Sequence, residues 1–283
     1  MNISYRLQRF IDNSILYIFL LVASLFIGLP LVVLAAQSLM PNTEILNLPP
    51  KLISSSSTLE HYRTLFERDD LMLPRWLYNS LYVSVATTLM TLVVASPAAY
   101  AFARLRFPLR TPLFFLLLLT VMVPVQMTYI PNFVLMRDLK WLDTHKALIY
   151  PNVANVFAVF LLRQFFMSIP RELEEAARLD GASYLTVFTR IIIPLSTNAL
   201  VAMSIFVFLA SWNELVWSLI VINRVEMRTL PAGLTVLNGA FTTTDRGLVM
   251  AGATVASIPV LMIYIVLQRW IIKGITFTGM GGR

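Results

Sequence analysis

Six apolar runs constrain this chain more than any other feature of its sequence. They cover residues 15–36, 79–103, 112–130, 147–167, 198–222 and 247–268. A transmembrane helix needs about 20 mostly apolar residues, so each run is close to the length that crosses a bilayer. The whole chain is 58% hydrophobic and 13% charged, whereas soluble domains are nearer half apolar and a quarter charged. We therefore expect an all-α integral membrane protein, with six transmembrane helices in a single domain over residues 1–283.

The order of these runs predicts the topology. The first run is longer than the apolar region of a secretory signal, which has about 7–15 residues, so we interpret it as an uncleaved span. Six spans place both termini on one side of the membrane. The short loop that carries Arg104, Arg106 and Arg110 favours the cytoplasm for that side, because cytoplasmic loops are enriched in Lys and Arg. Alternation then makes residues 37–78 an extracytoplasmic loop, with the character of a small ordered cap, and residues 168–197 a cytoplasmic loop.

Enzymatic and metal chemistry is not indicated. The chain has no cysteine, and its two histidines, His61 and His145, are far apart and lack a metal-ligand spacing. It contains neither a phosphate-binding Gly-x-x-x-x-Gly-Lys-Ser/Thr loop nor a Gly-x-Ser-x-Gly nucleophile turn. We expect no catalytic residue, no metal site and no cofactor in this chain. The net charge of +7 is not concentrated in a tract, which favours a membrane-side bias over nucleic-acid binding.

Polar residues within the apolar runs are candidates for a translocation pathway. Asn152 and Asn155 are three residues apart and share a helix face, where they could line a path or hydrogen-bond to a neighbouring helix. Glu214 follows Trp212 and Asn213 in the segment Ser-Trp-Asn-Glu. An ionised acid at the bilayer centre costs at least ~2.5 kcal/mol, so Glu214 needs a partner or an aqueous cavity. The alternative is that Glu214 lies near the outer interface, with Trp212 and Trp217 in an aromatic belt.

A polar stretch at residues 171–195 separates the fourth and fifth runs. Its acids at Glu172, Glu174 and Glu175 suit a helix N-terminus, and Gly181 permits a bend, so we expect two short helices joined at Asp180-Gly181. Such a segment could lie on the membrane surface or dock to another protein. An autonomous transporter usually has internal repeats and several charged midplane sites. The chain has no evident repeat and one candidate charge, which points to a partner as the energy source.

Several segments resemble one known family. The sequence Glu174-Glu-Ala-Ala-Arg-Leu-Asp-Gly-Ala closely resembles the cytoplasmic EAA loop of binding-protein-dependent ABC transporter permeases. Five other segments resemble the carbohydrate-uptake, maltose-type members of that family: Ala98-Ala-Tyr-Ala-Phe-Ala-Arg, Ser211-Trp-Asn-Glu, Thr229-Leu-Pro-Ala-Gly-Leu, Met250-Ala-Gly-Ala and Gln268-Arg-Trp-Ile-Ile-Lys-Gly.

The resemblance implies a permease subunit that imports a sugar or related polyol by alternating access. Its partners would be a paralogous permease in a heterodimer, two ATP-binding cassette subunits that bind ATP and Mg, and an extracytoplasmic solute-binding protein. The chain would be no enzyme itself, and would lie in a bacterial or archaeal cytoplasmic membrane. Residues 168–197 would form the EAA coupling loop between helices 4 and 5. The residues that dock the ATPase would be Glu174, Glu175, Ala176, Ala177, Asp180 and Gly181. The alternative is an autonomous secondary transporter or channel for a small polar solute.

Overall fold

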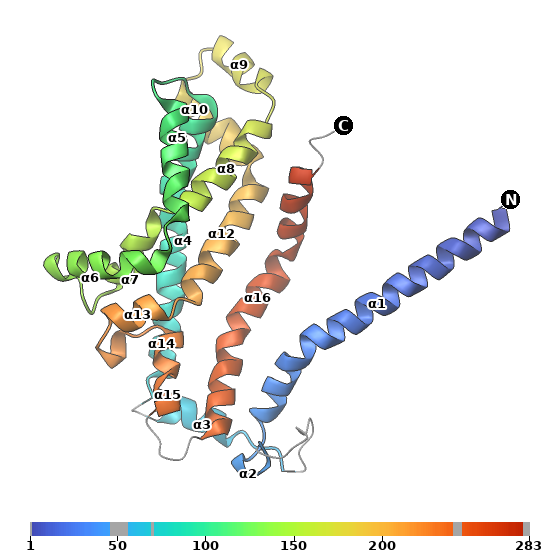
Figure 1. Cartoon of the computed structure of the whole chain (residues 1–283), viewed down its shortest axis with the longest axis vertical. Coiled ribbons are helices and arrows are strands. Elements are labelled where there is room, and N and C mark those ends of the chain that lie inside the picture. Colours follow the sequence, from blue (N-terminus) through green and yellow to red (C-terminus); the bar gives the residue numbers. More distant parts are fainter. Residues whose placement is uncertain (1, 46–55, 69–70, 240–244, 280–283) are drawn as a thin grey trace. The chain divides into compact units, whose positions relative to one another are not determined.

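The protein is helical throughout the part that the computed structural model describes, residues 2–45, 56–68, 71–239 and 245–279 (Figure 1). This confirms the predicted helical architecture. The α-helices are α1 (Asn2–Gln37), α2 (Asn42–Ile45), α3 (Glu60–Glu67), α4 (Leu73–Arg104), α5 (Arg110–Leu119), α6 (Tyr129–Asp138), α7 (His145–Val153), α8 (Val156–Ser168), α9 (Glu172–Leu179), α10 (Tyr184–Val187), α11 (Ile193–Leu195), α12 (Thr197–Trp212), α13 (Val216–Val221), α14 (Leu230–Leu234), α15 (Val236–Gly239) and α16 (Arg246–Gly279). Short 3-10 turns are η1 (Thr120–Met122), η2 (Val125–Thr128) and η4 (Val225–Met227), and η3 (Phe188–Ile192) is a π-helix.

Three helical segments of the described chain are long and apolar enough to cross a membrane: Asn13–Gln37, Leu73–Arg104 and Arg246–Gln268. Three further segments are long and apolar enough only when two consecutive helices are counted as one; in each, the two helices are separated by a short break and bent by more than 40°. The count is therefore three spans, or up to six if each bent pair is one span. The six-helix arrangement stays a prediction.

The bends fall inside or beside the third, fourth and fifth apolar runs. The segments Arg110–Met122 and Val125–Asp138 meet at 93°, around Pro124. Proline has no N–H and disfavours helical backbone in the residue before it, so the helix stops there. The other two pairs are bent by 43° between α7 and α8 and by 77° between α11 and α12. Proline kinks a helix, so Pro124 and Pro151 in the sequence predict kinks in the third and fourth runs, whereas the third bend lies just before the predicted start of the fifth run at residue 198.

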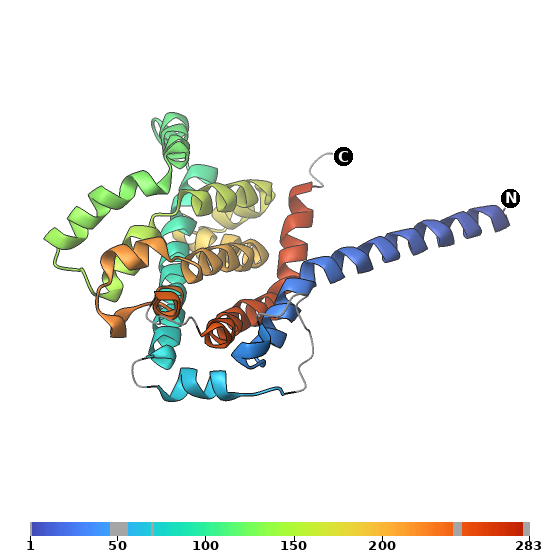
Figure 2. The same ribbon diagram turned by 60° about the horizontal axis from the view of Figure 1, so that its bottom comes forward.

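The chain divides into two compact units, the first formed by residues 1–71 and 234–257 and the second by residues 72–233 and 258–283. In the second unit α4 packs along α7, α8 and α12 (Figures 1 and 2). Small buried residues of α4, Ala95, Ala99 and Ala103, face Leu162 and Phe166 of α8 in one core. Small side chains let helix backbones approach closely, so α4 serves as the axis of this unit.

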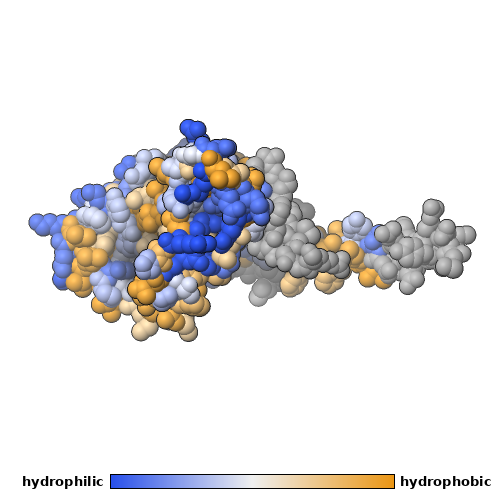
Figure 3. All heavy atoms as spheres, turned by 90° about the horizontal axis from the view of Figure 1, so that it is seen from above, coloured by the Kyte–Doolittle hydropathy of each residue, from blue (hydrophilic) through white to orange (hydrophobic). Residues whose placement is uncertain are grey.

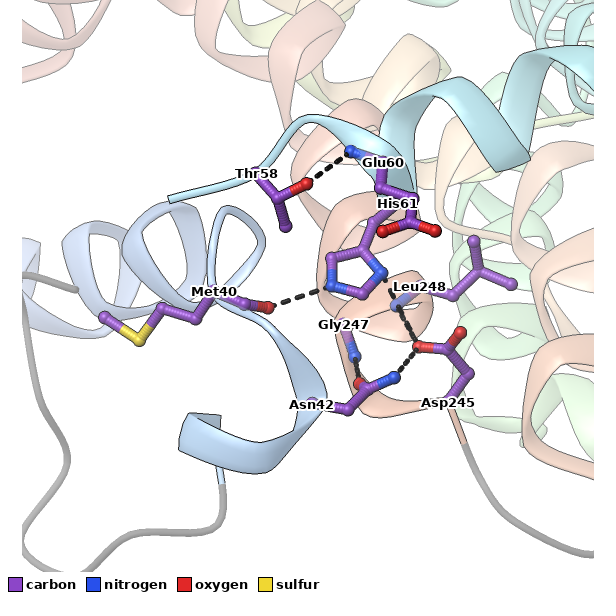
Figure 4. Close-up of polar contacts among 8 residues, drawn as sticks. All are labelled: Met40, Asn42, Thr58, Glu60, His61, Asp245, Gly247 and Leu248. Carbon is purple, nitrogen blue, oxygen red and sulfur yellow. Dashed lines mark hydrogen bonds and ion pairs between the residues drawn. The ribbon is translucent and has the colours of Figure 1, made fainter. Parts of the chain in front are cut away.

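In the first unit, a polar cluster joins three segments (Figure 4). Asp245, just before α16, accepts a hydrogen bond from the Asn42 side-chain amide at 2.9 Å, and the Asn42 oxygen accepts one from the Gly247 N–H at 2.8 Å. Buried His61 of α3 lies 2.9 Å from the Met40 carbonyl oxygen and 3.6 Å from Asp245. The cluster therefore fixes the end of α1 and α3 to the start of α16.

The predicted cap at residues 37–78 contributes α2 and α3 to this unit. Residues 46–55 and 69–70 of that loop lie outside the described residues. Helix α4 begins at Leu73, earlier than the predicted start at residue 79. Pro74 in its first turn explains the earlier start, since proline is favoured at the first helical positions.

Candidate functional site

The polar stretch between α8 and α12 turns at Asp180-Gly181, as its sequence predicts, with α9 before the turn and the successive helical elements α10, η3 and α11 after it. Helix α9 has Glu172, Glu174 and Glu175 in its first turn and Arg178 in its last turn, which complements the helix dipole. Gly181 then adopts a φ of +87°, a conformation that favours glycine. Its N–H donates to the Arg178 carbonyl at 3.1 Å, which caps the end of α9. The bend at Asp180-Gly181 is thus a local property of the sequence.

One face of α9 is held against the rest of the second unit by Arg104, the last residue of α4. The Arg104 guanidinium donates from Nη2 to the carbonyl oxygens of Phe166, at 2.6 Å, and Ile169. Its Nε lies 2.8 Å from Oε1 of Glu174 in α9. That contact is an ion pair without the alignment of a hydrogen bond. The two side chains are only 4% and 12% exposed, so Arg104 links α4, the end of α8 and α9 in a nearly dry contact.

Burial dominates the electrostatics of this contact. Loss of water around the Glu174 carboxyl raises its pKa above the usual value, and the positive charges of Arg104 and Arg171 offset that rise only in part. The nearby Glu175 carboxylate adds to the rise in this pKa, so the site disfavours the ionised form of Glu174. Arg104 donates to two backbone carbonyls, so its attachment at this site does not depend on Glu174 alone.

The opposite face of the stretch is open. Of the six residues predicted to dock an ATPase, Glu175, Ala176, Asp180 and Gly181 are exposed. Ala177 instead packs against the core of the unit, and Glu174 faces Arg104. Exposed apolar side chains accompany the open face: Leu173 at 45%, Leu179 at 89%, Tyr184 at 54% and Leu185 at 70%. An exposed apolar group with a polar rim is typical of a protein-binding surface.

A second candidate site is a small polar pocket of about 90 Å³ in the same unit. Three of the predicted pathway residues, Asn152, Asn155 and Glu214, come together in its lining. The remaining lining residues are Thr87, Val207, Ala210 and Ser211. Thr87 and Ser211 are not among the predicted pathway residues, because each shows in the sequence only as a hydroxyl group in an apolar run.

The pocket lies at the break between α7 and α8 and at the break between α12 and α13. Asn155 begins α8, and its side-chain oxygen accepts a hydrogen bond from the Ala158 N–H at 2.9 Å. Glu214 does the same for α13, accepting from the Trp217 N–H at 2.9 Å. At membrane depth, interrupted helices are tolerated where the backbone is buried or lines an aqueous cavity. The polar residues here both cap the interrupted helices and line the cavity, as in transporters with discontinuous helices.

Two predicted pathway residues do not reach this pocket. Trp212 is 2% exposed and stacks on Phe208 at 5.8 Å between ring centroids. Asn213 is exposed and donates its side-chain amide to the Leu209 carbonyl at 2.9 Å. Trp217 is also buried, with its indole N–H bonded to the Ala147 carbonyl at 2.8 Å. The rings of Trp212 and Trp217 therefore pack inside the unit, whereas an aromatic belt would expose them.

Comparison with known proteins adds the family. Residues 71–277 match the family described as "Binding-protein-dependent transport system inner membrane component". The chain is 32% identical over 277 residues to the sn-glycerol-3-phosphate transport system permease protein UgpE of Brucella abortus (strain 2308), covering 96% of this chain and 98% of the relative. It is 33% identical over 273 residues to the arabinooligosaccharides transport system permease protein AraQ of Bacillus subtilis (strain 168), covering 94% and 95%.

The fold is also known. A crystal structure of a bacterial ABC transporter involved in the import of the acidic polysaccharide alginate contains a chain that matches with a TM-score of 0.78 and 24% identity, over 95% of this chain and 98% of that one. At this identity the likeness concerns the fold. The match over residues 71–277 and the 32% identity with UgpE show that the chain belongs to the family of binding-protein-dependent transport system inner membrane components.

Proposed function

We propose that this chain is the permease subunit of an ATP-binding cassette importer that moves a sugar or related polyol by alternating access. The observation that carries the proposal is the open face of α9 and α10, where Leu179 and Leu185 are 89% and 70% exposed beside the positive-φ turn at Gly181. A chain with no phosphate-binding loop needs a separate source of energy, and this face offers a docking surface for ATPase subunits.

The two faces of α9 have different roles in this proposal. Glu175, Ala176, Asp180 and Gly181 contact the ATPase on the open face. Glu174 and Ala177 hold α9 against the permease on the other face. Because Arg104 joins α9 to α4 and α8, a displacement of α9 by the ATPase is passed to both of those helices. Interfaces that are well packed transmit such shifts instead of absorbing them.

The substrate class and the remaining partners rest on the relatives. Their names specify glycerol 3-phosphate and arabinooligosaccharides as the transported solutes. A second solved neighbour, with a TM-score of 0.60 and 16% identity, is an alginate ABC transporter in complex with an alginate pentasaccharide-bound periplasmic protein. A hydroxyl-rich solute suits the amide, hydroxyl and carboxylate groups of the polar pocket. We propose a paralogous permease and an extracytoplasmic binding protein as further partners, with both termini of this chain cytoplasmic.

The test is a charge reversal on the open face, Glu175→Lys, together with Gly181→Asp. Both variants are expected to reach the membrane and to uncouple ATP hydrolysis from solute uptake. Asp138→Lys is a matched control, because Asp138 is exposed on α6 and distant in sequence from α9. Uptake and hydrolysis are measured in vesicles that contain all subunits and the binding protein.

Two results would contradict the proposal. One is normal coupled uptake in both α9 variants. The other is ATP-independent movement of solute by this chain alone in vesicles, which would support an autonomous transporter or channel.

A further inference from the structure

An open, basic hollow lies at the end of α4 in the second unit. Its volume is about 480 Å³, and the residues that line it are Arg104, Arg106, Phe107, Leu109, Arg110, Thr111, Pro112 and Arg171. We propose that this basic hollow binds the phosphate headgroup of an anionic phospholipid.

The charges of the basic hollow are poorly compensated. Of its four arginines, Arg104 has the ion pair with Glu174. Arg110 donates to the backbone carbonyl of Leu105 at 3.0 Å, which supplies no negative charge. Arg106 and Arg171 are exposed and make no ion pair with any residue in the described ranges. The charge of Glu174 interacts with both Arg104 and Arg171, so the four arginines leave the hollow with a net positive charge, and guanidinium groups match the oxygen geometry of a phosphate.

The hollow continues into an apolar face, which favours a lipid over a free phosphate ion. Leu109 lines the hollow and is 69% exposed. On α5, Leu113 lies one turn beyond Arg110 and Leu116 one turn beyond Pro112, two residues that line the hollow, and these leucines are 43% and 61% exposed. A phospholipid presents its groups in the same order, with phosphate beside acyl chain. Inorganic phosphate would use the arginines alone.

The position of the basic hollow along the chain also favours a lipid ligand. The loop at residues 105–109 joins α4, which is long and apolar enough to cross a membrane, to the bent pair that begins with α5. Figure 3 shows hydrophilic groups beside hydrophobic ones on the end of the second unit that carries α5 and α9. Anionic lipids of the cytoplasmic leaflet attract basic clusters next to spans. Arg171 directly precedes α9, so a bound headgroup connects the α4–α5 loop to that helix.

The experiment measures lipid binding to the full chain, purified from its membrane in mild detergent, by native mass spectrometry. Phosphatidylglycerol is titrated into the wild type, into the double variant R106Q/R171Q and into the matched control R190Q/R224Q, which removes two exposed arginines elsewhere. If each arginine contributes about 1 kcal/mol near an anionic surface, R106Q/R171Q binds about thirtyfold more weakly. The control is expected to bind as the wild type does.

Further arms identify the ligand. Phosphatidylcholine, inorganic phosphate and soluble glycerophosphoglycerol are tested in the same way, and all three are expected to bind more weakly than phosphatidylglycerol. The double variant L113A/L116A keeps all four arginines. It should weaken the binding of phosphatidylglycerol and leave the binding of inorganic phosphate and glycerophosphoglycerol unchanged.

The proposal is overturned if R106Q/R171Q retains the wild-type affinity for phosphatidylglycerol. It is also overturned if inorganic phosphate binds as tightly as the lipid, which would indicate a free-phosphate site. Loss of a co-purifying protein subunit from R106Q/R171Q, with lipid binding unchanged, would make the hollow a protein-docking surface instead. None of these readouts depends on transport, so they are independent of the proposed function.

Discussion

Replacing Arg104 by glutamine is expected to release α9 from the second unit. The variant loses the guanidinium donor to the Phe166 and Ile169 carbonyls and leaves Glu174, whose side chain is 12% exposed, without its ion pair. A hydrogen bond from a charged group contributes about 1.5–3 kcal/mol, and breaking a buried ion pair costs about 3–5 kcal/mol. Glutamine recovers part of one hydrogen bond, so we expect a loss of about 3 kcal/mol in the local opening free energy.

Hydrogen exchange of the full chain in detergent measures this loss directly. A decrease of about 3 kcal/mol accelerates exchange by about a hundredfold in the amides of α9 and the last turn of α8, while α12 exchanges as in the wild type. Glu174→Gln is the comparison. Because burial already disfavours the ionised carboxylate, the neutral amide should change exchange by less than about tenfold. Wild-type protection in Arg104→Gln, or a larger effect of Glu174→Gln, would refute Arg104 as the anchor.

Three other perturbations test separate contacts. Burial raises the pKa of Glu174 above its usual 4.5, so the folded chain holds that proton more tightly than the unfolded chain does. The protection of α9 against hydrogen exchange, corrected for intrinsic exchange, should therefore fall as pH rises from 4.5 through the raised value. The variant Glu174→Gln should abolish this pH dependence. Gly233→Ala places a Cβ in steric conflict with the buried Trp76 ring. It should lower the free energy of unfolding by about 1–3 kcal/mol, measured as a lower Tm. In the control Gly28→Ala the new Cβ meets no atom within 4 Å, so the Tm should not fall. Asp245→Ala removes the side-chain acceptor at the start of α16 and should cost about 1–2 kcal/mol, measured as faster exchange in its first turn; unchanged exchange there would contradict that role.

The sequence predicts helices where a local property, such as apolar composition or a helix-ending glycine, determines the backbone conformation. Apolar runs locate the long helices, and the acids of α9 with Gly181 define both ends of a short one. Pro151 indicates a kink in the fourth run, but the sequence does not locate the break between α7 and α8. That break depends on Asn155, whose side chain caps a new helix in a run that is otherwise apolar. An asparagine in such a run is equally compatible with a continuous helix that bonds to a neighbour.

Prediction of the candidate sites is limited in the same way, because part of each site depends on contacts between residues that are distant in sequence. Asn152, Asn155 and Glu214 stand out because polar groups are costly in an apolar run. Thr87 does not, because a threonine hydroxyl can bond to the preceding turn of its own helix at little cost. The sequence likewise gives no sign that Glu174 faces inward while Glu175 is exposed. That difference depends on Arg104, which is distant in sequence and comes close only in the folded chain.

Helix α4 connects the two candidate sites. It contributes Thr87 to the polar pocket and Arg104 to the contact with α9, and it is helical over the whole interval between them. At 1.5 Å per residue the two positions are about 25 Å apart along the helix. The other pocket walls come from helix pairs interrupted at Asn155 and Glu214, where the backbone can change direction. Under the proposed function, a displacement of α9 would therefore reach the pocket through a continuous helix and would meet interrupted helices there.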